Sequence, residues 1–397
     1  MSGDRFRRTR LGALAGVVAL TVCLPVATAP GALARRAAVQ ETRSPTPTPS
    51  PKPSASIGKG EGTLQVLTYQ GHVEYGGATA SADWLSPFEK LTGCRVSRLD
   101  RVHSGEEMAE KVRSASYDVI SASPDLAGRL IADGAVRPLD TTLLRSYKDI
   151  PRRLRELPAT RDASGKVYGV PYLWGTNQVI REPGAPDGPD AVYRTEQSAV
   201  RDTPLSIADA ALALRRTRPE LGVKDPYQLT PAQLDAAVGL LAEHDGPRRV
   251  YWTSTLEVIQ AFSTGEAHVA QALPYHLDLF ERAGRTVERE KGPVTGWADA
   301  WMVGTGATSP NCAYKWLNWV GSADTQHSAA AWTGLAPANV KACDGEVRRL
   351  CDAYHARDDR ELGHVLFATR PTKDCGGSGG ECTDYTEWEK RWKDLVK

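Results

Sequence analysis

The chain has 397 residues, of which 41% are hydrophobic, and a formal net charge of +1. This length is sufficient for two cores of domain size. Residues 1–34 contain four arginines and one aspartate, so the rest of the chain carries 45 basic and 47 acidic residues. This balance excludes a strongly basic, nucleic-acid-binding protein.

The N-terminal residues 1–34 have the pattern of a secretory signal peptide. Four arginines precede an apolar run over residues 11–29, and Ala-Leu-Ala at residues 32–34 offers a cleavage site. Two alternatives remain open, an uncleaved membrane anchor and a lipoprotein leader acylated at Cys23. All three place the rest of the chain outside the cytoplasm, at the cell surface or associated with the membrane.

A spacer over residues 35–62 separates this leader from the folded region. Its centre, residues 44–55, is a tract of proline, serine and threonine that cannot bury a core and is typical of an extended tether.

The folded region begins with strands and helices in alternation, which predicts an α/β sheet. Strand patterns cover 63–69, 94–99 and 117–121, and helix patterns cover 84–91, 105–114 and 124–132. Further on, Thr230, Pro231 and Gln233 form the pattern of a capping box that opens a helix. Other helices are expected at 205–216, 254–263 and 312–320, and a strand at 167–171.

Six cysteines follow Cys23, an even number that fits disulfide bonding in an oxidising compartment. Short spacing favours the pairs Cys343–Cys351 and Cys375–Cys382, which leaves Cys94–Cys312. Six cysteines allow fifteen connectivities, so this pairing is a hypothesis. A zinc site is the rival interpretation, but there is no CxxC pair and no histidine at ligand spacing. We therefore predict neither a metal nor a cofactor.

No catalytic motif of the common hydrolases, nucleotide-binding proteins or metalloproteases occurs in the chain. Two aromatic segments are distinctive instead, Tyr172-Leu173-Trp174-Gly175 and Gly296-Trp297-Ala298-Asp299-Ala300-Trp301. Aromatic faces beside a carboxylate suit an organic cation, although buried packing of these tryptophans is the competing interpretation.

Over residues 63–397 the chain resembles the extracytoplasmic solute-binding proteins of the spermidine/putrescine type. The resemblance rests on WLSPFEKLTGC at 84–94, YDVISAS at 117–123, YGVPY at 168–172, SIADAAL at 206–212, PNCAYKW at 310–316, APAN at 336–339 and PTKDC at 371–375. It implies a two-lobe, periplasmic-binding-protein-like fold of type II, with crossover hinge strands and a ligand cleft between the lobes. Residues 63–170 and 300–397 would form lobe 1, with the C-terminal tail wrapped around it, and residues 171–299 would form lobe 2.

The resemblance also implies a set of cleft residues. Trp297 and Asp299 fit the family's Trp-x-Asp element, in which the ring packs on the ligand's methylene chain and the carboxylate takes an amine. The full set of implied ligand-binding residues is Tyr69, His72, Ser123, Asp125, Trp174, Ser206, Trp297 and Asp299. The chain departs from the family at several of these positions: it has His72, Asp125 and Ser206 where the family usually has aromatic or acidic residues. Asp125 is a candidate for the second anionic partner that a polyamine needs.

The function implied is that of a monomeric binding protein, not an enzyme. It would capture a small cation, best predicted to be a polyamine such as spermidine or putrescine, and deliver it to an ABC permease and its ATPase. Alternatives are another small polar metabolite, a surface sensor or interaction module on the same fold, and an exported hydrolase or transferase.

Overall fold

The computed structural model describes residues 56–396 except residues 81 and 376–379. The leader, Cys23 and the Pro/Ser/Thr tract lie outside the described residues. Among the helices that are described, none is long and apolar enough to cross a membrane.

Lobe 1 is built on three parallel strands, with β1 paired to β2 on one side and to β3 on the other. Helices connect the strands, and the Ser104 hydroxyl accepts a hydrogen bond from the backbone N–H of Glu107 to cap the second helix. These elements are β1 (Thr63–Tyr69), α1 (Leu85–Thr92), β2 (Arg95–Val102), α2 (Gly105–Ser114), β3 (Val119–Ala122) and α3 (Pro124–Ala132). The alternation predicted from the sequence is therefore present.

Lobe 2 repeats this design with β5 between β6 and β7, all parallel. The predicted capping box at Thr230 and Gln233 is formed and begins α6. The elements are β5 (Ser198–Arg201), α5 (Ser206–Thr217), α6 (Pro231–Ala242), β6 (Val250–Trp252), α7 (Thr255–Thr264), β7 (Val269–Ala272), α8 (Pro274–Arg282) and β8 (Glu288–Arg289).

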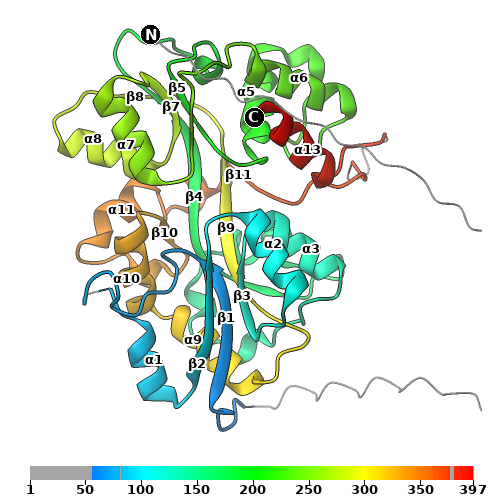
Figure 1. The fold of residues 1–397 in the computed structure, drawn as a ribbon, viewed down its shortest axis with the longest axis vertical. Helices are drawn as coiled ribbons and strands as arrows, with labels where there is room; N and C mark the ends of the chain where they lie inside the picture. Colours follow the sequence, from blue (N-terminus) through cyan, green and yellow to red (C-terminus); the bar gives the residue numbers. More distant parts are fainter. Residues whose placement is uncertain (1–55, 81, 376–379, 397) are drawn as a thin grey trace, which may run out of the picture. The chain divides into compact units, whose positions relative to one another are not determined.

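Two long strands, β4 (Gly169–Arg181) and β9 (Val294–Val303), cross from one lobe to the other (Figure 1). They pair with each other in antiparallel fashion, and β9 also pairs with β3 while β4 pairs with β7. The main path through the sheet is therefore β2-β1-β3-β9-β4-β7-β5-β6. The predicted crossover hinge is thus present, with each crossing strand belonging to both lobes.

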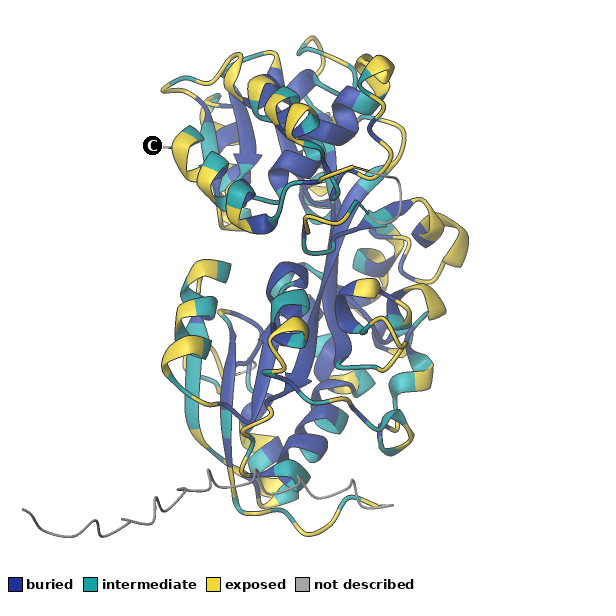
Figure 2. Cartoon of the chain, turned by 90° about the vertical axis from the view of Figure 1, so that its right-hand side faces the viewer, coloured by how far each residue is buried: buried dark blue, intermediate teal, exposed yellow. Residues whose placement is uncertain are grey.

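The remaining elements cover the hinge and the ends of the lobes. They are α4 (Arg152–Arg155), α9 (Pro310–Val320), α10 (Ala323–Thr333), β10 (Ala336–Pro337), α11 (Val347–Ala353), α12 (Asp359–Gly363), β11 (Val365–Phe367) and α13 (Tyr385–Leu395). Figure 2 shows the central strands of the sheet as a buried layer between helices, while the edge strand β2 is only partly buried. Burial of the apolar helix faces on this sheet is the main stabilising contribution.

Three disulfides are formed in the pairing that the spacing favoured: Cys94–Cys312, Cys343–Cys351 and Cys375–Cys382. The first joins segments 218 residues apart and ties the end of α1 to the start of α9.

Two boundaries differ from the sequence prediction. The expected spacer ends before residue 62, because the Glu61 carboxylate accepts hydrogen bonds from the backbone N–H groups of Asn311 (3.0 Å) and Cys312 (2.9 Å). These are free amides of the first turn of α9, where a carboxylate is favoured by the helix dipole.

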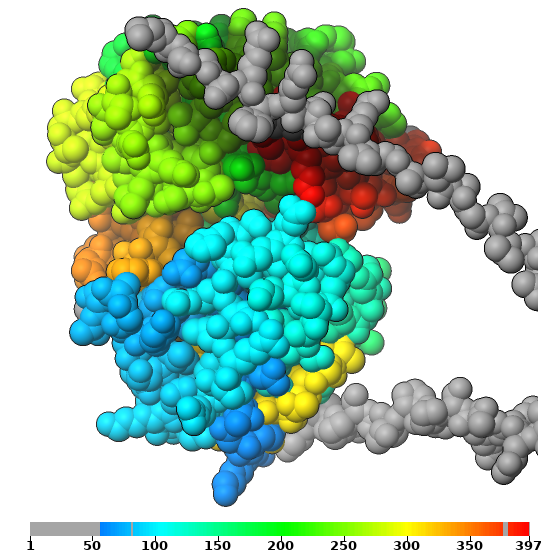
Figure 3. Space-filling model, in the orientation of Figure 1, coloured from blue at the N-terminus to red at the C-terminus, as the bar shows by residue number. Residues whose placement is uncertain are grey.

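The C-terminal tail does not lie on lobe 1 alone. Helix α13 packs against α6, and Trp392 donates a hydrogen bond to Asp202 (2.8 Å) in lobe 2, while Arg370 donates to the Asp125 carbonyl (3.2 Å) in lobe 1. From α13, Lys393 reaches Glu106 on α2 at 2.7 Å, which places α13 opposite lobe 1 (Figure 3). The amphipathic face of α13 carries Tyr385, Trp388 and Trp392, and this face required an apolar partner that α6 supplies.

Candidate functional site

Six of the eight predicted cleft residues come together where β1 and β3 end and β9 crosses the hinge. Tyr69 is the last residue of β1, Ser123 follows β3 directly, and Asp299 lies in the middle of β9. The carboxyl ends of parallel strands are the usual place for a ligand in an open α/β sheet. The topology therefore brings these side chains to one site from three strands.

Three oxygen atoms converge at the start of α2. The Tyr69 hydroxyl, an Asp125 carboxylate oxygen and the Ser123 hydroxyl lie 3.6, 3.8 and 3.9 Å from the place where a Cβ on Gly105 would stand. The absence of a side chain at Gly105 keeps this space open. Burial raises the pKa of Tyr69, and the Asp125 and Asp299 carboxylates add to that effect. The Tyr69 hydroxyl is thus protonated and can donate a hydrogen bond.

Asp299 is the central carboxylate of the site, with 5% of its surface exposed. Its pKa is raised to about 7, mainly by burial; Arg201 opposes this rise and the nearby Asp125 adds to it. The His72 Nε2 atom lies 3.7 Å from its carboxylate. Within the described residues, no side chain or backbone group donates a hydrogen bond to Asp299.

His72 is buried and neutral. Burial lowers its pKa to about 4, its Nδ1 atom lies 3.3 Å from the Ser121 hydroxyl, and its ring meets the ring of Tyr172 edge to face. A neutral imidazole cannot neutralise Asp299, so His72 shapes the site, and the opposing charge near this carboxylate is that of Arg201, which is not within ion-pair distance.

The ring of Trp297 packs against the protein's own groups. The guanidinium carbon of Arg201 lies 3.7 Å from the centroid of its ring. Another part of the ring lies against Gly175, where a Cβ would come within 2.5 Å of it. The protein's own cation therefore contacts the ring for which the resemblance implied stacking on a ligand.

Trp174 and Ser206 lie outside the ligand space, contrary to prediction. Trp174 is fully buried in the hinge, and its Nε1–H donates to the Pro337 carbonyl at 3.1 Å. Ser206 is also fully buried, and its hydroxyl donates to the Arg201 carbonyl at 2.7 Å. The polar groups of both residues form hydrogen bonds within the protein, so these residues support the site by packing beside it.

Arg201 is the main residue that the sequence analysis missed. A basic residue that ends a strand immediately before a helix is a detectable signal, because that is where a parallel strand delivers a side chain to the cleft. The tail residues Arg370 and Tyr385 were also missed. They line a pocket with Asp125 between α3 and α13, and the Arg370 guanidinium lies 4.8 Å from the centre of the Tyr385 ring.

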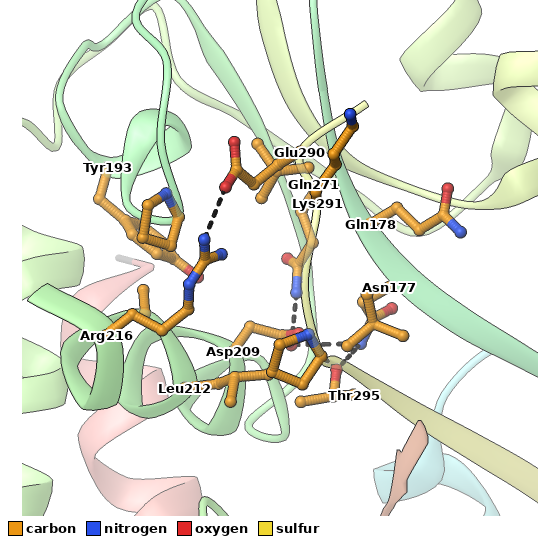
Figure 4. Close-up of a pocket in the computed structure, with 15 residues that line it drawn as sticks. Asn177, Gln178, Tyr193, Asp209, Leu212, Arg216, Gln271, Glu290, Lys291 and Thr295 are labelled. Carbon is orange, nitrogen blue, oxygen red and sulfur yellow. Dashed lines mark hydrogen bonds and ion pairs between the residues drawn. The ribbon is translucent and has the colours of Figure 1, made fainter. Parts of the chain in front are cut away.

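A second pocket lies within lobe 2, around Asp209 on α5 (Figure 4). Asp209 accepts hydrogen bonds from Asn177 (3.1 Å), Gln271 (2.5 Å) and Thr295. At the rim, Arg216 and Glu290 pair at 2.9 Å. The charges of this pocket are thus satisfied by the protein, and we assign it a structural role.

No group of three or more His, Cys, Asp or Glu side chains in the described part of the chain could hold a metal ion. The cysteines that offered a zinc site are all in the three disulfides.

Comparisons with known proteins agree with this architecture. Residues 197–347 match the family model of the bacterial extracellular solute-binding proteins. The putrescine-binding periplasmic protein of Escherichia coli is 23% identical over 339 residues, which is 79% of this chain and 90% of that protein. The resemblance to the spermidine/putrescine type of solute-binding protein is confirmed.

The solved structures give the same result for the fold. A spermidine/putrescine ABC transporter protein from Listeria monocytogenes superposes with a TM-score of 0.65 at 18% identity, covering 84% of this chain and 98% of that one. A lipoprotein of Treponema pallidum gives a TM-score of 0.63 at 16% identity, covering 84% and 99%. The two-lobe fold of type II is therefore confirmed.

Proposed function

We propose that this protein is the extracytoplasmic substrate-binding component of an ABC importer. It captures, between its two lobes, a small solute that has an amino group. It then delivers this solute to a permease and its ATPase. Polyamines are the first class to test, because putrescine is what the Escherichia coli relative is named for. The protein acts as a monomer without a cofactor, and the leader with its Pro/Ser/Thr tract tethers it outside the cell, with or without a lipid on Cys23.

The observation that carries this proposal is the state of Asp299. A buried carboxylate that receives no hydrogen bond from the described residues is unfavourable in the empty protein. An ammonium group supplies the missing donors and a counter-charge within ion-pair distance at once. Because the site is made by the hinge strand β9 and by groups from both lobes, such a ligand also stabilises the arrangement in which the lobes meet.

Binding without turnover distinguishes this function from that of an enzyme. The first experiment is a thermal-shift screen of the purified protein against polyamines, amino acids, betaines and sugars. A ligand specific to the folded state stabilises it by about 2.7 kcal/mol at a hundredfold excess over Kd. The ligand should be recovered unchanged after prolonged incubation.

Asp299→Ala should weaken binding of an amine ligand by about 2 kcal/mol, roughly 30-fold in Kd, because a charge-assisted hydrogen bond is lost in a desolvated site. The matched control is Glu110→Ala, which removes a carboxylate from the exposed face of α2 and should leave Kd unchanged. Equal Kd values for Asp299→Ala and the unmodified protein would contradict the proposed role of this carboxylate. The absence of any shift across the screen would count against the function itself.

A further inference from the structure

The placement of Arg201 bears on the identity of the ligand. Arg201 ends β5, and its backbone is fixed on both sides: its N–H donates to the Gln271 side chain at 2.8 Å, and its carbonyl accepts from Ser206 at 2.7 Å. Because both of these partners are buried, the side chain leaves a rigid strand end in a fixed direction. It points toward the ring of Trp297 and the hinge.

The guanidinium of Arg201 is held by aromatic rings and not by a carboxylate. Its carbon lies 3.7 Å from the Trp297 centroid and 5.7 Å from that of Trp252. It interacts electrostatically with Asp299 and Asp209, but neither is within ion-pair distance, and its side chain donates no hydrogen bond to any residue that the structure describes. Ring contacts leave the edge of the guanidinium, with its five N–H donors, available.

Several other arginines of lobe 2 do pair with carboxylates. Arg216 pairs with Glu290, Arg285 with Glu182, and Arg181 with Glu288. Arginine is the residue best suited to hold a carboxylate through two parallel hydrogen bonds. The partly buried Arg201, which has no such partner among the described residues, is suited to receive an anionic group of a ligand.

The other charged groups of the site are consistent with a ligand that has both a positive and a negative end. Asp299 and Asp125 are the carboxylates that face the ligand space, while His72 is neutral. A diamine would place its two ammonium groups on Asp299 and Asp125 and would leave the Arg201 guanidinium without an anionic partner. A molecule with one ammonium and one carboxylate instead finds an opposite charge for each end.

We propose that the cleft binds a small amino acid or ω-amino acid, with its ammonium on Asp299 and its carboxylate on Arg201. This inference rests on the proposed function and narrows its substrate class from amines in general to aminocarboxylates. Trp297 then serves to orient Arg201, a positioning role in place of the ligand stacking implied by the resemblance.

The test compares ligands that differ only in one end group. Binding of putrescine and 4-aminobutanoate, and of cadaverine and 5-aminopentanoate, is measured by isothermal titration calorimetry on the purified protein at pH 8. The unmodified protein should bind each aminocarboxylate at least about tenfold more tightly than its diamine, since only the aminocarboxylate forms a charge-assisted hydrogen bond with the Arg201 guanidinium.

Arg201→Gln should reverse this preference, weakening the aminocarboxylate about 30-fold while strengthening the diamine. Arg201→Lys keeps the charge and should keep part of the preference. Arg216→Gln, in the second pocket, is the matched control and should change neither Kd.

Three results would overturn the inference. If the diamines bind the unmodified protein more tightly than the aminocarboxylates, the proposed function stands and the substrate class is wrong. If diamines bind only after Arg201→Gln, Arg201 is an internal substitute for a cationic ligand. If neither compound of either pair, nor any amino acid, binds the unmodified protein, the substrate class fails together with the amine-binding function.

Discussion

Asp209, which is partly buried, and Asp299, which is buried, are carboxylates that have the same charge but differ in their partners. Burial raises the pKa of each to about 7. Asp209 receives hydrogen bonds from three side chains that come from β4, β7 and β9. Asp299 receives none from the described residues, and the His72 Nε2 atom lies 3.7 Å from its carboxylate. A buried charge that the protein satisfies is part of the structure, and one that it leaves unsatisfied marks a place for a ligand.

The most direct test of this comparison removes each carboxylate in a separate variant and compares the free energies of unfolding of the two variants. Asp209→Ala leaves the buried donors of Gln271 and Thr295 without their acceptor and should lower the free energy of unfolding by about 3 kcal/mol. Asp299→Ala removes a group that has no donors and should change it by less than about 0.5 kcal/mol. Urea denaturation followed by tryptophan fluorescence measures both. Equal losses of unfolding free energy in the two variants would show that the hydrogen bonds to Asp209 do not account for its contribution to stability.

A smaller change sharpens the comparison by removing one side-chain hydroxyl of this network. Thr295→Val keeps the shape of the side chain but deletes the hydroxyl that donates to Asp209 and accepts from Asn177 (2.9 Å), and it should lower the free energy of unfolding by about 2 kcal/mol. Thr217→Val is the matched control, because that hydroxyl bonds only the Ala213 carbonyl within its own helix at 3.1 Å. The control should lose less than about 0.5 kcal/mol. Similar losses in both would assign the effect to the hydroxyl itself and not to Asp209.

The smallest predicted effect is on pH dependence. Asp299 binds an ammonium only when ionised, and its pKa is raised to about 7, while the pKa of His72 is lowered to about 4, so His72 stays neutral above pH 6. Affinity for an amine ligand should therefore rise about tenfold between pH 6 and pH 8. Calorimetric titration at several pH values measures this rise, which Asp299→Asn should abolish. A slope that survives in Asp299→Asn would mean that another group titrates, with Asp125, Tyr69 and Arg201 facing the same space.

The free energy of unfolding of the protein without ligand should fall as the pH rises, whereas the affinity rises. A carboxyl group whose pKa is raised by folding favours the folded state at low pH, and this contribution is lost as the pH rises through its folded value. Ionisation of Asp209 and of Asp299 should therefore lower the free energy of unfolding as the pH rises from about 4 to 7. An amine ligand should restore only the share of this lost free energy that is due to Asp299.

Much of the fold follows from the sequence alone. Strand and helix patterns at 63–69, 105–114 and 124–132 coincide with β1, α2 and α3, because periodicity and capping residues act over a few neighbouring positions. Cysteine spacing indicated the disulfides, and the family resemblance implied that Tyr69, Ser123 and Asp299 line one cleft. The structure brings these three residues to one place because strand ends in a parallel sheet converge whatever the details of packing.

Tertiary structure alone decided the rest. No local pattern tells Asp209 from Asp299, because the donors that satisfy Asp209 lie 32, 62 and 86 residues away in the chain. The attachment of α13 to lobe 2 depends on an apolar face of α6 that the sequence does not pair with it. The contact between Arg201 and Trp297 likewise joins a strand end to a crossover strand, and it exists only because the fold brings their side chains together.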